Sequence, residues 1–262
     1  MLELKNMTNY DFYNREERAI CSHLFRLLHE HIEKKADSPL AQFLKIVFEH
    51  DIVFKNGHKN FADLNFDRIA IYCEVSLLRD AYQNRKPHIN SFMDNLTRLI
   101  MNQENIQKCR LFTELPKPLN DIKVTHPNQI IRKANSEHIE LSNSENIVYA
   151  SMQGMFNAKP DLVLIIDDIL LVCEAKFTER FDEKQFKRTL NIAEIWSTLL
   201  YEDLGFKQPP IYSIFKLGAS YFKPEINWTE VIKIAEKTYR ENDRTRIAIK
   251  AGVELLRKMQ YE

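Results

Sequence analysis

The chain has 262 residues, enough for one large domain or for a domain with a sizeable extension. Its 37 basic and 37 acidic side chains balance, which excludes a protein that binds nucleic acid by overall charge alone and leaves room only for a local basic patch. No apolar run could cross a membrane and no apolar signal segment opens the chain, so we expect a cytoplasmic protein with no membrane contact.

Residues 1–115 are predicted to form a helical N-terminal region. The prediction rests on apolar side chains that recur at three- and four-residue steps. Amphipathic helices are predicted over 14–32, from Ser38 with Pro39 at its first position, over 67–82 and over 89–109.

The pattern changes after the breaker-rich segment 115–121, and residues 116–262 are predicted to form an α/β core with C-terminal helices. Extended segments and a polar stretch at 135–146 come first. Two short apolar runs rich in Val, Ile and Leu follow and favour strands over a helix. The predicted elements are strands at 161–167 and 168–176, a helix at 182–204, a strand at 211–217, and helices at 229–239 and 244–258.

The two apolar runs predict an antiparallel hairpin with a defined register. A turn centred on Asp167 and Asp168 places Asp161 opposite Glu174, with their Cβ atoms about 5 Å apart on one face of the sheet. Lys176, two residues beyond Glu174, shares that face. A two-residue turn of Asp-Asp is not the favoured Asn-Gly or Asp-Gly, and a slip of one residue would destroy the pairing.

Two carboxylates at this separation repel one another unless a cation or a shared proton lies between them. Mg²⁺ prefers oxygen ligands, commonly one or two carboxylates together with water and substrate phosphate. Such an ion can polarise a phosphoryl oxygen, and a nearby lysine can stabilise the negative charge that develops. The arrangement suits hydrolysis of a phosphodiester; the alternative is a hairpin whose ends carry solvated charges.

Pro160-Asp161, twelve further residues and then Glu174-Ala175-Lys176 resemble the motif of PD-(D/E)xK nucleases, the restriction-endonuclease-like superfamily. The resemblance implies an α-β-β-β-α-β core with a mixed sheet, which the first helix of the N-terminal region would complete. It implies that Asp161, Glu174 and the Ala175 carbonyl bind Mg²⁺ or Mn²⁺, and that Lys176 is the catalytic lysine. It covers about residues 159–217.

Many relatives carry an acidic residue on the first core helix that reaches toward the metal. Glu17 continues the apolar face of the predicted first helix, and Glu16 is almost as well placed. The alternative is an acidic first turn favoured by the helix dipole. Glu74, on the predicted helix over 67–82, is a rival for the same role.

Gln185 lies on the helix after the motif, where the RecB-like branch of the superfamily carries a glutamine and, four residues later, a tyrosine. Thr189 stands in place of the tyrosine, which departs from that branch. We expect Gln185 to meet the site or the nucleic acid. Other chemistry finds no support, because the sequence lacks GxGxxG and HExxH and the signatures of Ser and Cys nucleophiles.

The primary hypothesis is therefore a Mg²⁺-dependent deoxyribonuclease that acts as an endonuclease on DNA. The hypothesis allows a homodimer. RNA as the substrate stays open. A second hypothesis keeps the fold without the reaction, as a nucleic-acid-binding or assembly subunit. The complete set of two acids and a lysine discriminates them, because a module that only binds has no need of all three.

Overall fold

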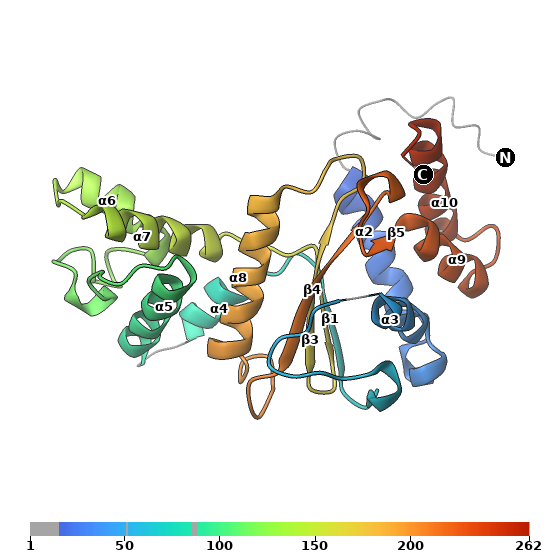
Figure 1. The fold of residues 1–262 in the computed structure, drawn as a ribbon, viewed down its shortest axis with the longest axis horizontal. Helices are drawn as coiled ribbons and strands as arrows, with labels where there is room; N and C mark the ends of the chain where they lie inside the picture. The colour runs from blue at the N-terminus through green and yellow to red at the C-terminus, as the bar shows by residue number, and fades with distance from the viewer. Residues whose placement is uncertain (1–15, 51, 85–87, 262) are drawn as a thin grey trace. The chain divides into compact units, whose positions relative to one another are not determined.

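The computed structural model describes residues 16–50, 52–84 and 88–261, which form an α/β fold with a five-stranded mixed sheet (Figure 1). The chain divides into two units. The sheet unit comprises Met1–Glu74, Pro160–Phe186 and Ile211–Glu262, and the helical unit comprises Val75–Lys159 and Lys187–Pro210. The predicted boundary after residue 115 falls inside the helical unit, and the sheet unit takes segments from both predicted regions.

The strands of the sheet lie in sequence order: β1 (Ile69–Tyr72), β2 (Leu162–Ile166), β3 (Ile169–Ala175), β4 (Ile211–Gly218) and β5 (Ile226–Asn227). β1, β2 and β3 pair antiparallel, whereas β4 pairs parallel with β3, and β5 with β4. A parallel pair needs a long crossover connection, which contains α8 (Glu183–Leu199). The strands predicted at the hairpin and at 211–217 are confirmed.

β1 corrects the prediction of one helix over 67–82. The segment instead forms a strand, Ile69–Tyr72, followed by the short helix α4 (Leu77–Asn84). A short apolar stretch fits the period of a helix and of a strand about equally well, so its periodicity did not distinguish them.

The described helices of the sheet unit are α2 (Glu16–His29), α3 (Pro39–Glu49), α9 (Trp228–Thr238) and α10 (Arg244–Lys258). As predicted, Ser38 caps α3 and its hydroxyl accepts a hydrogen bond from the Ala41 N–H. Apolar side chains of all four helices join one buried core with alternate residues of β2 and β3, including Leu164, Leu171 and Cys173. Side chains of a strand alternate between faces, so Glu174 and Lys176 belong to the opposite face of the sheet.

The described regular elements of the helical unit are all helices: α4, α5 (Ile89–Gln103), α6 (Ile130–Ser136), α7 (Asn143–Phe156) and the part of α8 from Lys187. α6 and α7 overturn the extended segments that were predicted in this part of the chain, and residues 137–142 of the polar stretch connect the two helices. Short 3₁₀ turns occur in both units. Those of the sheet unit lie at Ile32–Asp37, Phe61–Asp63 and Ser220–Phe222, and those of the helical unit at Phe112–Glu114 and Pro127–Gln129.

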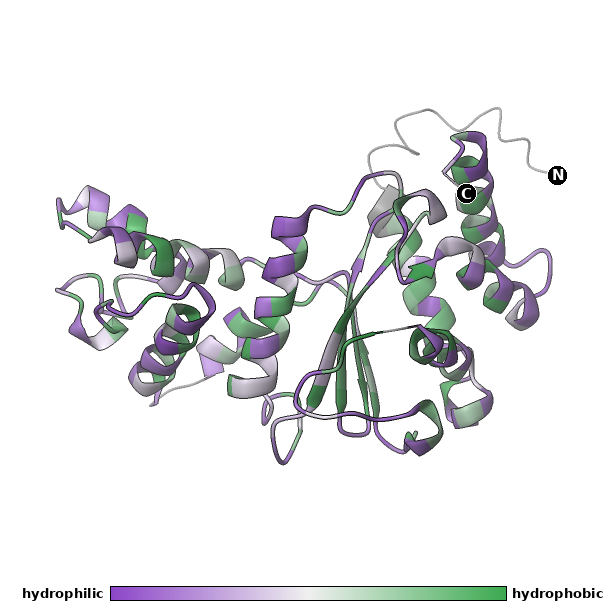
Figure 2. Cartoon of the chain, in the orientation of Figure 1, coloured by the Kyte–Doolittle hydropathy of each residue, from purple (hydrophilic) through white to green (hydrophobic). Residues whose placement is uncertain are grey.

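Strands and helices differ in hydropathy (Figure 2). The strands are hydrophobic along most of their length, whereas the helices carry mixed hydrophilic and hydrophobic faces. Within the described part of the chain, no helix combines the length and the apolar character that a membrane span requires.

Candidate functional site

The β2–β3 hairpin has the predicted register. Ile166 pairs with Ile169 and Leu162 with Cys173, around a two-residue turn. The next position along the hairpin places Asp161 opposite Glu174. A direct contact supports this placement, because the Ala175 N–H donates a hydrogen bond of 2.8 Å to Oδ2 of Asp161.

The Asp-Asp turn, unusual for a hairpin, is stabilised by a lysine. Asp167 adopts a positive φ of 56°, a conformation that Asp tolerates better than most residues. The ammonium group of Lys59 pairs with the carboxylates of both Asp167 and Asp168. Pairing with one cation offsets the repulsion between adjacent carboxylates, so the turn can hold the register on which the site depends.

Glu174 and Lys176 are charged residues in a nearly buried position, with 4% and 6% of their surfaces exposed. Nζ of Lys176 lies 3.3 Å from Oε1 of Glu174, and the side-chain amide of Gln185 donates to the same oxygen. Burial of a charge is costly unless it is paired and hydrogen-bonded. These three predicted site residues therefore form one connected polar cluster.

Backbone geometry gives the Ala175 carbonyl a defined direction. The Lys176 N–H donates a hydrogen bond of 2.8 Å to the Leu217 carbonyl of β4, so this N–H points toward β4. Successive residues of a strand alternate between its two edges, and the N–H and C=O of one residue share an edge. The Ala175 N–H and C=O both face the β2 edge, where the Asp161 carboxylate lies.

Glu74 lies two residues beyond the end of β1, and its prediction as a helical residue is wrong. It has a φ of 51°, and its N–H donates to the Pro160 carbonyl at 3.1 Å. Burial and then the negative charges of Glu74 and Asp161 raise the pKa of the neighbouring Cys73 thiol. The end of the sheet that carries Asp161 thus carries a further acid, in the segment that follows β1.

The side chains of Glu16 and Glu17 lie outside the described residues. Their helix, α2, contributes its described apolar residues Ile20, Leu24 and Leu27 to the core on the sheet face opposite Glu174. The prediction that a helix-borne acid reaches the metal stays a prediction.

Sequence reasoning missed Lys216. In β4 it pairs with Glu174 in the parallel register, and its Nζ lies 4.2 Å from the centroid of the Phe186 ring and 5.7 Å from that of Phe181. The sequence placed a strand over residue 216, but it held no signal for the offset between two strands that are separated by a helical crossover.

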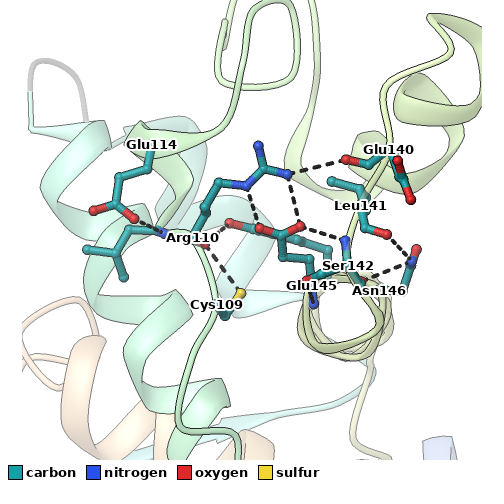
Figure 3. Close-up of polar contacts among 10 residues, drawn as sticks. Cys109, Arg110, Glu114, Glu140, Leu141, Ser142, Glu145 and Asn146 are labelled. Atoms are coloured by element: carbon teal, nitrogen blue, oxygen red, sulfur yellow. Dashed lines mark hydrogen bonds and ion pairs between the residues drawn. The ribbon is translucent and has the colours of Figure 1, made fainter.

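The helical unit contains a second polar cluster, centred on Arg110 (Figure 3). Its guanidinium forms a two-point ion pair with Glu145, with a separation of 2.9 Å between Nη2 and Oε2, and also donates to the Glu140 carbonyl. The ion pair holds the pKa of Glu145 down at about 2, with further help from the Ser142 N–H. Both charges are matched, which is typical of a structural ion pair.

The donor set at the hairpin fits a hard divalent cation. It offers carboxylate oxygens from Asp161 and Glu174 and a carbonyl from Ala175, the ligand types that Mg²⁺ takes beside water and phosphate oxygens. Among the described residues, no group of three or more His, Cys, Asp or Glu side chains is arranged to hold a metal ion. A cation held at the hairpin would take two carboxylates and one backbone oxygen from the protein.

Comparison with protein-family models, with curated proteins and with solved structures found no match to this chain.

Proposed function

We propose that the protein is a metal-dependent nuclease that hydrolyses phosphodiester bonds of DNA, with its active site at the open end of the β2–β3 hairpin. One observation carries the proposal: the observed register opposes Asp161 and Glu174 and gives Lys176 the same face of the sheet. The resemblance to PD-(D/E)xK nucleases depends on this opposition, which a slip of one residue would have removed.

The order of elements supports the same proposal. α2 precedes three antiparallel strands, and α8 then leads to β4, which is parallel to β3. With α3 and the helices between β1 and β2 set aside, this order matches the α-β-β-β-α-β core that the resemblance implies. The helical unit contributes one insertion, between β1 and β2, and its second segment, Lys187–Pro210, includes most of the core helix α8.

Each site residue has a proposed role. Asp161, Glu174 and the Ala175 carbonyl would hold Mg²⁺ or Mn²⁺, which when bound supplies polarisation of a phosphoryl oxygen and a more acidic water. Lys176 would stabilise the negative charge that develops on the phosphate, or orient the attacking water. Gln185 would fix the Glu174 carboxylate through the hydrogen bond on Oε1.

A second candidate function is a nucleic-acid-binding or assembly subunit that does not cleave. The observation that favours it is the ion pair between Glu174 and Lys176, 3.3 Å apart and nearly buried. A pair of this kind compensates its own charges, so it could persist for structural reasons alone. The two candidates differ in one result, whether DNA is cut when a divalent cation is present.

The proposal predicts that the purified protein cleaves plasmid or single-stranded DNA with Mg²⁺ or Mn²⁺ and not with EDTA. Lys176→Ala and Asp161→Asn should each lower the rate by about 100-fold or more, since the first removes a cation that stabilises the developing negative charge and the second removes a carboxylate that would hold the metal. The measurement is product formation over time on labelled DNA, with circular dichroism to confirm folding.

Lys123→Ala is the matched control, because exposed Lys123 follows Asp121 in the same acid-x-lysine spacing but lies in the helical unit. It should cleave at the wild-type rate. Full activity in Lys176→Ala would reject the assigned roles, and DNA binding by a wild type that never cleaves would favour the second candidate.

A further inference from the structure

Lys216 has surroundings that an ordinary surface lysine lacks. Its side chain is half-buried, and its ammonium lies over the Phe186 and Phe181 rings. No carboxylate within the described ranges comes within ion-pair distance of this ammonium. The Glu225 carboxylate accepts a hydrogen bond of 2.7 Å from the backbone N–H of Lys216.

The position of Lys216 is fixed by elements that also build the candidate active site. Its partner in the parallel register is Glu174, and neighbouring strands lie about 4.8 Å apart. Phe186 directly follows Gln185, whose amide bonds Glu174. The same turn of α8 therefore orients the Glu174 carboxylate and holds the Lys216 ammonium.

Gly218 helps to hold the second ring. A Cβ at this position would come within 2.9 Å of Cε2 of Phe181, so only glycine lets the ring approach this part of β4. Aromatic faces attract a cation without neutralising it. The ammonium is thus held in place beside the site while its positive charge stays available to an anion.

We propose that Lys216 binds a phosphate of the nucleic-acid backbone next to the phosphate that is cleaved. This inference rests on the proposed function and identifies how the substrate strand is held: Lys176 serves the scissile phosphate, and Lys216 serves its neighbour along the strand. A phosphodiester backbone presents negative charges at regular spacing, so two fixed cations on adjacent strands can engage two of them.

Binding of labelled DNA by the full-length protein tests the proposal. Fluorescence anisotropy would be measured in EDTA at several salt concentrations, with a 20-nucleotide single strand and the corresponding duplex. Lys216→Met retains the apolar stem against the rings and removes the charge. This variant should bind DNA several-fold more weakly. The slope of log affinity against log salt concentration should become shallower by about 0.9 for the duplex or about 0.7 for the single strand.

Two further variants separate charge from packing. Lys216→Arg retains the charge and should keep the wild-type slope. Lys45→Met removes an exposed lysine from α3, on the opposite side of the sheet from Glu174, and should also bind as wild type. A wild-type slope in Lys216→Met, or an equal loss in Lys45→Met, would overturn the proposal.

Cleavage measured in parallel distinguishes this inference from the proposed function. For Lys216→Met we expect a higher KM with little change in kcat, because uniform binding is lost and the chemical step is not. Metal-dependent cleavage by the wild type together with an unchanged slope in Lys216→Met would reject only the role of Lys216. A wild type that neither binds nor cuts DNA would reject the nuclease and the Lys216 contact together.

Discussion

Glu145 is a buried residue whose negative charge is stabilised by its hydrogen-bond partners. Its side chain is 4% exposed, accepts hydrogen bonds from Arg110 and from the Ser142 N–H, and forms a capping box at the start of α7. A carboxylate stabilised by several donors is easier to deprotonate, which is why its pKa falls to about 2.

Glu145→Gln should lower the free energy of unfolding by about 1–3 kcal/mol at neutral pH, the usual cost of losing charged hydrogen bonds in a buried position. The folded pKa lies below the unfolded value of about 4.5. The contribution of the charge is therefore fully present above about pH 4.5 and is lost as the pH falls toward about 2. Urea unfolding at several pH values should show the variant and the wild type converging on acidification.

The control for this prediction is Glu140→Gln, which alters an exposed glutamate nearby in the same unit. It should leave stability unchanged at every pH. A stability difference for Glu145→Gln that stays constant from pH 7 to pH 3 would contradict the role assigned to the ion pair.

Among the helices, α10 packs closely on its neighbours at Gly252. A Cβ there would lie 2.7 Å from Cδ1 of Ile20 on α2 and 3.1 Å from Cζ of Phe177. Gly154 on α7 is a useful contrast, because the nearest atom to its added Cβ is Nε of Arg188 at 3.6 Å, an ordinary contact with a long side chain. The two helical glycines differ in packing and not in backbone conformation.

Gly252→Ala should destabilise the protein by about 1–3 kcal/mol through overpacking, whereas Gly154→Ala should stabilise it by up to about 1 kcal/mol through helix propensity. Thermal or urea unfolding measures both. Ile20→Val, which removes the closest atom, should recover part of the loss in the double variant. Equal effects of the two alanine substitutions would show that the α2–α10 contact does not decide the difference.

The elements differ in how far the sequence could predict them. The hairpin was predictable with its register, because two apolar runs meet at two polar residues and β-sheet pairing then determines which side chains oppose. β1 was missed because its four residues carry too little periodicity. α7 could have been found, since Ser142 and Glu145 have the capping-box spacing, although they lie in a polar stretch without an apolar period.

The candidate site was predicted in part for the same physical reason. Asp161, Glu174 and Lys176 follow from local strand geometry, and the structure brings Gln185 to Glu174 as expected. Lys216 and Glu74 depend on pairings across long connections. No local pattern encodes the offset between such strands. Lys216, and the place of Glu74 beyond a strand instead of on a helix, could therefore be recognised only in the folded chain.

At the scale of the whole molecule, a divalent cation that binds only the folded protein must raise its stability. In a thermal melt, Mn²⁺ at 100 times its dissociation constant should add about 2.7 kcal/mol to the free energy of unfolding. Asp161→Asn should abolish this gain while folding normally without metal, because it removes one of two opposed carboxylates and keeps an oxygen for the Ala175 N–H. An equal Mn²⁺-induced gain in stability in the wild type and in Asp161→Asn would show that the cation binds at another site.

The exposed Asp80→Asn, in the helical unit, is the control and should respond to Mn²⁺ as the wild type does.

The placement of β1 also has a consequence for synthesis on the ribosome. About 90 residues separate β1 from β2, its partner in the sheet, and most of them belong to the helical unit. At about 5–20 residues per second, β1 waits roughly 5–20 seconds before its partner is made. During that interval the helices of the insertion can form by local contacts, before β1 gains its partner in the sheet.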